Sequence, residues 1–338
     1  MAKSLTVASL FAGLGGFSLA FRREGFSSIW ANEFDKFACA THRHNHPDVP
    51  VIECNVKDFH PVVLNLEPPD ILTAGFPCQP FSAAGERLGL DDERGTLYQE
   101  ILRIVREFGR DRPAMLLLEN VGNLLGHDER RTYPKIENDL RRAGYWMLPQ
   151  NVRRLNTRIH TDIPHNRERV FIIALSTDVF RGGSFVFPEP QKRTRPITDF
   201  LDTRKKQDDY FYFDIKKNRF GAMIWHRVQQ GDPTSVYQLR RCYVREHKSF
   251  VPALTANMGD GGHNVPVIVD RWGIRKLTPG ECAAFQGFVG RGASFPKLVS
   301  RNQSYKQIGN SVTIPLVQKL AAACRSLFEN PALFRRSA

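Results

Sequence analysis

The stretch from Pro69 to Ser82 constrains this chain most, because a short apolar run ends there in a loop bounded by prolines. The run is apolar enough for a buried parallel strand, and Gly75 allows the backbone to turn at its end. Pro77 and Pro80 stiffen the loop around Cys78, so we expect its thiol to be held in place. A fixed thiol after a strand favours covalent catalysis, although a small buried cysteine in a tight turn fits the same residues.

The composition indicates a globular protein that binds polyanions. The chain has 338 residues, of which 41% are hydrophobic and 25% charged, enough for two domains or for one large domain with an insertion. No apolar run approaches the roughly 18 residues of a membrane span, and the N-terminus lacks a signal-peptide core, so we expect a cytoplasmic protein. The formal net charge of +13 makes nucleic acid the leading partner, although a merely basic protein shows the same charge.

The cysteines and histidines do not predict a metal site. The six cysteines show no CxxC spacing, so neither a zinc site nor a disulfide framework is indicated. His42, His44 and His46 alternate just before Pro47, a pattern more typical of a solvated turn than of metal ligands. We therefore expect no metal.

The N-terminus predicts a strand, a glycine turn and a helix. Residues 5–10 form the strand-like run, residues 11–16 (FAGLGG) the turn and residues 17–23 the helix. The third glycine of a dinucleotide-binding GxGxxG motif is replaced by Ser18, which disfavours a nicotinamide oxidoreductase. A nucleoside ligand without a pyrophosphate fits the tight turn better, although many glycine turns only end a strand.

Polar side chains follow several of the predicted strands. The second strand, at 28–33, ends in Glu33, roughly twenty positions beyond the turn, where α/β nucleoside-binding folds place a ribose-binding carboxylate. An ordinary charge at a helix N-terminus is the alternative for Glu33. Asn55 follows the third strand, where it can meet an adenine edge, and Glu119 ends the strand at 114–118. A carboxylate beside a cysteine at the ends of neighbouring strands is typical of active sites in open α/β sheets.

The second half of the chain differs from the first in composition and in its predicted pattern of strands and helices. From about residue 182 the regular alternation of strands and helices stops, and residues 204–248 combine many Lys and Arg residues with aromatic ones. This composition predicts a second domain with a nucleic-acid-binding surface, and a solvated basic face explains the charge equally well.

Ordered motifs along nearly the whole chain resemble those of the DNA (cytosine-5) methyltransferases of bacterial restriction-modification systems. The motifs are FAGLGG (11–16), Asn32-Glu33, GFPCQPFS (75–82), RGTL (94–97), Glu119-Asn120-Val121, RERVFII (167–173), RKLTPGECAAFQGF (275–288) and QIGNSV (307–312).

The resemblance implies an α/β fold with a doubly wound, mostly parallel sheet, as in S-adenosylmethionine-dependent methyltransferases, and an inserted smaller target-recognition domain. It implies a catalytic and cofactor-binding domain at 1–185 and a target-recognition domain at 186–272. These are followed by a hinge and return segment at 273–304 and by a C-terminal helical segment at 305–338, which completes the catalytic domain.

The resemblance also implies the cofactor S-adenosyl-L-methionine and the residues around it. The implied cofactor-binding residues are Phe11, Leu14, Gly16, Glu33, Phe34, Asn55, Pro77, Leu97 and Asn310. The implied catalytic residues are Cys78, Glu119, Arg167 and Arg169. Two positions depart from the family pattern: His165 stands where a glutamine is usual, and Asn55 where an aspartate is usual.

The implied reaction explains these residue types. Cys78 adds to C6 of cytosine, Glu119 binds the N3 and amino edge, Arg169 holds O2, and Arg167 orders the Cys78 loop and a nearby phosphate. C5 then accepts the methyl group, and the base must be flipped out of the duplex. We expect a monomer acting on double-stranded bacterial chromosomal DNA, with a cognate restriction endonuclease as a genetic rather than a physical partner.

Two other functions fit the same motifs less well. The tRNA-methylating branch of the family generally has Pro-Pro-Cys where this chain has Phe76-Pro77-Cys78, and its Cys-Phe-Thr motif is absent here. A catalytically silent DNA-binding regulator with the same fold would be expected to lose Cys78, Glu119 or Arg169, and all three are present.

Overall fold

The computed structural model describes residues 4–76, 96–127, 130–191, 195–240, 242–260, 264–288 and 294–334. The chain forms two compact units. The first contains Met1–Leu155, Glu168–Glu189 and Ile314–Ala338, and the second contains Asn156–Arg167 and Pro190–Thr313. The first unit's second stretch ends at Glu189, and residues 273–313 pack with the second unit.

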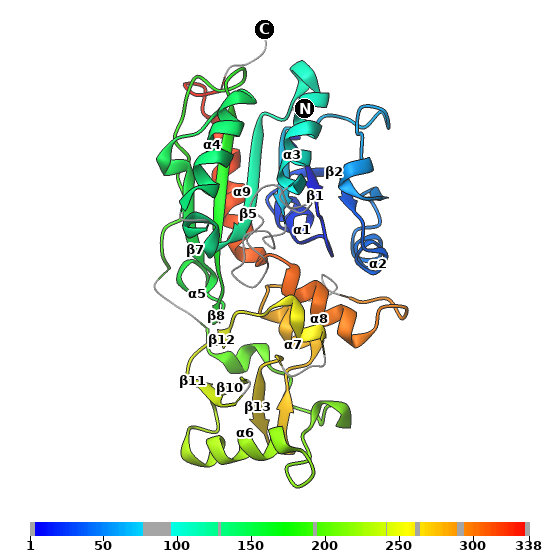
Figure 1. Ribbon diagram of the computed structural model, residues 1–338, viewed down its shortest axis with the longest axis vertical. Coiled ribbons are helices and arrows are strands. Elements are labelled where there is room, and N and C mark those ends of the chain that lie inside the picture. The colour runs from blue at the N-terminus through cyan, green and yellow to red at the C-terminus, as the bar shows by residue number, and fades with distance from the viewer. Residues whose placement is uncertain are drawn as a thin grey trace. The chain divides into compact units, whose positions relative to one another are not determined.

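The first unit is built on an eight-stranded sheet (Figure 1). Its strands, in spatial order, are β3 (Val51–Glu53), β2 (Ser27–Glu33), β1 (Thr6–Leu10), β4 (Ile71–Gly75), β5 (Met115–Val121), β9 (Glu168–Ser176) and β6 (Tyr145–Trp146), with β7 (Val152–Asn156) also paired to β9. The five strands from β3 to β5 are parallel, and β9 runs antiparallel to β5. The chain reverses its direction of winding between β1 and β4, as the predicted doubly wound sheet requires.

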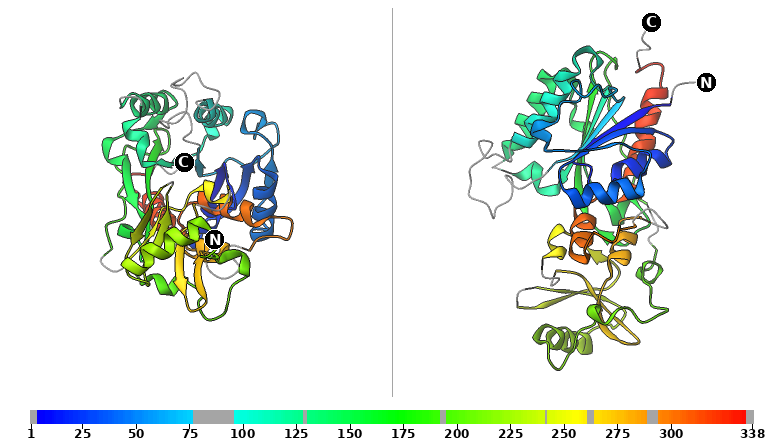
Figure 2. Two further views of the ribbon diagram at one scale, coloured as in Figure 1. Left: turned by 60° about the horizontal axis from the view of Figure 1, so that its bottom comes forward. Right: turned by 90° about the vertical axis from the view of Figure 1, so that its right-hand side faces the viewer.

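Helices cover both faces of this sheet (Figure 2, right). They are α1 (Gly16–Arg23), α2 (Lys36–Asn45), α3 (Thr96–Glu107), α4 (Thr132–Arg142) and α9 (Ile314–Glu329). The apolar side of α3, with Ile101, Ile104 and Val105 at helical spacing, packs with α4 on buried residues of β1, β4, β5 and β9. Directly after α1, the backbone carbonyl of Glu24 accepts a hydrogen bond from Arg325 of α9. This packing fixes the strand ends that carry the candidate site.

The second unit contains a four-stranded antiparallel sheet. Its elements are β11 (Val244–His247), β10 (Val236–Leu239), β13 (Val267–Asp270) and β14 (Gly273–Lys276) in spatial order, the helices α5 (Thr157–His160), α6 (Arg219–Gln230), α7 (Pro279–Ala284) and α8 (Arg301–Asn310), and a parallel pair, β8 (His165–Asn166) with β12 (Val251–Pro252). Ile224 and Val228 of α6 pack on Tyr237, Val267 and Ile274 of the sheet.

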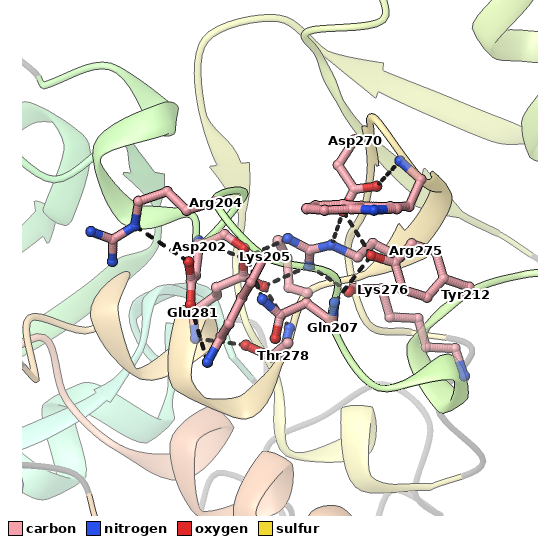
Figure 3. Close-up of polar contacts among 12 residues, drawn as sticks. Asp202, Arg204, Lys205, Gln207, Tyr212, Asp270, Arg275, Lys276, Thr278 and Glu281 are labelled. Atoms are coloured by element: carbon pink, nitrogen blue, oxygen red, sulfur yellow. Dashed lines mark hydrogen bonds and ion pairs between the residues drawn. The ribbon is translucent and has the colours of Figure 1, made fainter.

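A buried ionic network joins this sheet to α7 (Figure 3). Arg275 of β14 is fully buried and lies 2.7 Å from both Asp270 Oδ2 and Glu281 Oε1. Glu281 also accepts hydrogen bonds from the backbone nitrogens of Thr278 and Asp202, at 2.8 and 2.9 Å. Because a buried guanidinium is stable only with its partners, this network fixes the sheet relative to the start of α7.

Candidate active site

Six of the residues proposed from the sequence lie at one edge of the first unit's sheet. The carboxyl ends of parallel strands meet at the same edge, so Asn55 after β3, Glu33 at the end of β2, Phe11 after β1 and Glu119 near the end of β5 are gathered there. Arg169 joins them because β9 runs in the opposite direction and begins at this edge. Gly16, at the start of α1, follows the turn after β1.

The glycine turn after β1 has an unusual backbone. Phe11, Gly13 and Gly15 have φ values of 52°, 55° and 95°, in the left-handed region that is costly for residues with a side chain. Strain of this kind at Phe11 is typical of functional sites. A Cβ added to Gly13 would meet no atom within 4 Å, so the turn presents its backbone to open space. Leu14, in contrast, is buried.

Glu33 is ordered by backbone donors. Its Oε2 accepts a hydrogen bond from Gly13 N at 2.8 Å, and its Oε1 accepts from Phe34 N and Asp35 N, both at 2.9 Å. Phe34, directly after this strand, is 69% exposed, although large aromatic side chains are usually buried. A preorganised carboxylate beside an exposed aromatic ring and an open backbone turn matches the groups of a nucleoside.

Asn55 and Leu97 flank this region. Asn55 Oδ1 accepts a hydrogen bond from Lys57 N at 3.0 Å, which leaves one lone pair on the oxygen and both amide hydrogens for a ligand. Cys54 N donates to Glu33 O at 3.2 Å, so Asn55 is tied to the end of β2 through its neighbour. Leu97 of α3 is half-buried and packs on the same apolar core as Phe11.

The histidine cluster corrects the expectation of a solvated turn. His42 and His46 are buried on α2 and at its end, with ring centroids 4.9 Å apart, because they pack beneath the glycine turn. A Cβ on Gly15 would lie 2.3 Å from His46 Cδ2, so only glycine fits there. Burial lowers the pKa of His42 to about 3 and that of His46 to about 4, so both rings are neutral at pH 7.

Glu119 and Arg169 form a close pair at the other side of the edge. Arg169 Nε lies 2.9 Å from Glu119 Oε1, an ion pair without the alignment of a good hydrogen bond. Glu119 stands opposite Gly75 on β4, and a Cβ there would lie 3.3 Å from Glu119 Oε2. The carboxylate therefore lies beside the strand that leads to Cys78.

Cys78 and Pro77 lie outside the described residues, but the start of their loop is described. Asn120 Nδ2 donates a hydrogen bond to Phe76 O at 3.1 Å, and Asn120 is buried. Sequence reasoning gave Asn120 no role. The sequence did offer a signal, because Asn120 follows Glu119 directly at the end of a predicted strand. Adjacent side chains on a strand point to opposite faces, so Asn120 faces the other side of the sheet from Glu119.

Arg167 and His165 have buried partners within the second unit. Arg167 donates to the carbonyl oxygens of Leu254, Gly309 and Ser311, at 2.6, 3.1 and 2.6 Å. His165 Nδ1 lies 3.1 Å from Phe285 O, and its Nε2 accepts from Leu254 N at 3.1 Å. Both side chains therefore connect motif segments of the second unit, a role that the sequence did not predict.

The QIGNSV segment has its own close contact. Asn310, the last residue of α8, is exposed and belongs to the second unit. A Cβ on Gly309 would lie 2.2 Å from the carbonyl carbon of Thr255, so the helix backbone approaches that segment as closely as glycine allows. Gln286 Nε2 donates to Ile308 O at 3.0 Å, which ties the same end of α8 to the segment after α7.

The comparisons with known proteins place the chain in a family. The model of the C-5 cytosine-specific DNA methylase family matches residues 5–326, so the chain belongs to this family. It is 41% identical over 320 residues to the type II methyltransferase M.Bsp6I of Bacillus sp. (strain RFL6), covering 94% of this chain and 97% of the relative. It is 34% identical to the type II methyltransferase M.HpaII of Haemophilus parainfluenzae, covering 94% and 88%. The family and the enzyme class predicted from the motifs are confirmed.

The fold is also confirmed by a solved structure. The S. pombe Dnmt2 methyltransferase superposes with a TM-score of 0.70 at 19% identity, covering 96% of this chain and 99% of that one. In the part of the chain that the structure describes, no helix is long and apolar enough to cross a membrane. Within the same residues, no group of three or more His, Cys, Asp or Glu side chains is arranged to hold a metal ion.

Proposed function

We propose that this enzyme transfers a methyl group from S-adenosyl-L-methionine to C5 of a cytosine in a specific double-stranded DNA sequence, through a covalent Cys78 adduct at C6 of a flipped base. The observation that carries the proposal is the position of the Glu119–Arg169 pair at the strand edge, beside the strand that leads to Cys78, in a chain of the cytosine-specific family. We further propose that it acts as a cytoplasmic monomer and protects host DNA from a cognate restriction endonuclease.

The residues at the glycine turn suit the proposed cofactor. The ordered Glu33 carboxylate can accept the ribose hydroxyls, the exposed Phe34 ring can stack on adenine, and the open space at Gly13 allows close backbone approach. Asn55 offers hydrogen-bonding groups to the adenine edge. S-adenosyl-L-methionine supplies the methyl group that is transferred. We propose that Asn310 and Pro77 also contact it.

The proposed chemistry gives each catalytic residue one task. The Cys78 thiolate forms a bond to C6, which makes C5 nucleophilic, while Glu119 binds N3 and the amino group as charge develops. Arg169 orients Glu119 and binds O2. After C5 is methylated it loses its proton, and Cys78 leaves as the C5–C6 double bond re-forms. For Arg167, the three carbonyl partners support a structural task within the second unit rather than a phosphate contact.

Burial makes Cys39, Cys54, Cys282 and Cys324 poor nucleophiles, which supports Cys78, whereas Cys242 is exposed. Burial raises the pKa of Cys39 to about 12, and it also raises the pKa of Cys282 and Cys324. A thiol that stays protonated at pH 7 reacts slowly, because the thiolate is the nucleophile. Cys54 is half-buried and its pKa is also raised, mainly by burial.

A trapping experiment tests the proposal. A duplex with 5-fluorocytosine at the target position blocks the loss of the C5 proton, so the protein should stay covalently attached to the DNA after methyl transfer. We expect a denaturation-resistant adduct that requires S-adenosyl-L-methionine and maps to Cys78 by mass spectrometry. Cys78→Ala should abolish the adduct and leave DNA binding in place.

The outcomes separate the alternatives. A silent regulator would give no adduct with any cofactor, and an adduct on another cysteine would overturn Cys78 as the nucleophile. Preferential trapping on fluorinated tRNA would favour a tRNA methyltransferase. The target itself is found by sequencing methylated cytosines in a host that expresses the protein.

A further inference from the structure

The second unit has a basic pocket that the family motifs do not explain. A cavity of about 410 Å³ is lined by Arg158, Arg195, Thr198, Thr234, Lys248 and Ser249, with Pro196 and Ile197 between them. We call this the basic pocket. Three of its lining side chains are cationic, and none of the described residues that line it is acidic.

Arg158 is held in place at one side of the pocket. Its Nη2 donates a hydrogen bond to Ser249 Oγ at 3.2 Å, and its Cζ lies 4.5 Å from the ring centroid of Phe250. Because Ser249 Oγ accepts this bond, its own hydrogen is left to donate to a ligand. A guanidinium already stacked on a ring loses little side-chain entropy when it binds an anion.

Arg195 is held in a similar way from another segment. Its backbone nitrogen donates to Asp162 O at 2.7 Å, and its Cζ lies 4.7 Å from the ring centroid of Phe200. Its Nε lies 2.9 Å from Asp199 Oδ2, which offsets part of its charge and leaves the terminal nitrogens as donors. Phe200 itself stacks on the buried Phe285, with ring centroids 5.0 Å apart, so the ring beneath Arg195 is held by the core of the second unit.

The remaining wall is mixed in character. Lys248 is exposed and brings a third positive charge. Thr234 Oγ1 donates to Asp232 Oδ1 at 2.6 Å, so its hydroxyl offers lone pairs rather than a hydrogen. The Asp232 carboxylate interacts with Lys248, which limits the net charge on this side. The donors are therefore concentrated at Arg158, Arg195, Lys248 and Ser249.

We infer that the basic pocket binds a backbone phosphate of the duplex DNA. The inference rests on the proposed function for its substrate, and it adds a contact that holds the duplex without reading its sequence. Two preorganised guanidinium groups, an exposed ammonium and a hydroxyl donor match the oxygens of a phosphodiester. The formal net charge of +13 favours a polyanion over a small free anion.

The test measures the binding of the full-length protein to a random-sequence DNA duplex at several salt concentrations. Lys248→Gln and Arg195→Gln should each reduce the slope of log Kd against log salt by about one, the value for one lost phosphate contact. Arg195→Lys should retain most of the slope, since it keeps the charge. Lys135→Gln, which removes one exposed charge from α4 in the first unit, is the matched control and should leave the slope unchanged.

Melting temperatures confirm that each variant is folded. A pocket variant that is folded and has the slope of the Lys135→Gln control overturns the inference. A second result would also overturn it: inorganic phosphate raises the melting temperature of the wild type but not of the variants, and all of them bind DNA with the same salt slope. The pocket would then hold a free anion. Binding to random-sequence DNA does not require methyl transfer. Methylation of a plasmid by the wild type is therefore measured separately, and it shows whether the proposed function fails independently of the phosphate contact.

Discussion

Glu119 has two neighbours that decide what its substitution should do: Arg169 at 2.9 Å and the backbone of Gly75. Glu119→Gln keeps the shape of the side chain but removes the charge that pairs with Arg169 and stabilises the developing charge on cytosine. We expect the single-turnover rate of methyl transfer to fall by about 10² or more. Glu168→Gln on β9, next to Arg169 and with an exposed side chain, is the control and should keep the rate. An unchanged rate in Glu119→Gln would exclude the assigned role.

The two buried histidines predict a pH dependence of stability. The folded-state pKa values of His42 and His46, about 3 and 4, lie below the ordinary value of 6.5, so below pH 6.5 the unfolded chain binds protons that the folded chain does not. Their contribution is therefore complete above pH 6.5 and is lost as the pH falls toward 4. Each histidine should cost at most about 2 kcal/mol of stability between pH 6.5 and 5.

Urea unfolding at pH 7.5 and at pH 5 measures this dependence. Arg22 and Asp48 also act electrostatically on His46, so the comparison needs a variant. His42→Phe removes one titrating ring from the site and should reduce the difference between the two pH values. If the wild type and His42→Phe lose the same stability between pH 7.5 and 5, His42 is not responsible. Cofactor affinity should follow the same trend, because these rings support Gly15.

At the scale of elements, the close approach of α8 to the segment around Thr255 depends on Gly309, which has no side chain. Gly309→Ala would place a Cβ 2.2 Å from a backbone atom of Thr255, which cannot move away like a flexible side chain. We expect a loss of about 1–3 kcal/mol or more in unfolding free energy, as for other overpacked sites. Gly280→Ala is the matched control, because its Cβ would meet only Thr278 Oγ1 at 3.9 Å. Equal stability of the two variants would contradict the contact.

The elements also show what the sequence could predict. The edge that gathers Glu33, Asn55 and Glu119 was predictable, because the strands are apolar and the carboxyl ends of parallel strands meet. The burial of His42 and His46 was not, since it depends on how α2 packs beneath the glycine turn. The carbonyl partners of Arg167 were not either, because they lie 87 to 144 residues away along the chain. The strands of the sheet in the second unit are four residues each, too short to show a period, and β11, β13 and β14 also carry charged residues.

At the scale of the whole molecule, the division into units indicates which residues can be replaced by those of a relative in order to change the DNA sequence that is recognised. A graft of residues 186–272 would separate Asp270 from Arg275, which are 2.7 Å apart and buried. It would also separate Phe185 from Phe187, whose rings contact each other with centroids 4.8 Å apart. An unpaired buried charge costs about 3–5 kcal/mol, so this graft should be unstable wherever the donor lacks the matching residues.

A graft of residues 190–281 avoids both separations, since it takes Asp270, Arg275 and Glu281 from one donor and leaves the phenylalanine pair in the host. We expect this chimera, built from a relative that marks another DNA sequence, to melt at a higher temperature than the 186–272 chimera and to methylate the donor's sites. Bisulfite sequencing of the expressing host identifies the methylated cytosines. The exposed pair Arg301–Asp208 serves as a control: Arg301→Gln in the host should change stability by about 1 kcal/mol or less, because surface pairs contribute little. If the longer chimera folds and still marks the host's original sites, recognition lies outside residues 190–281, and the basic aromatic segment within it has another task.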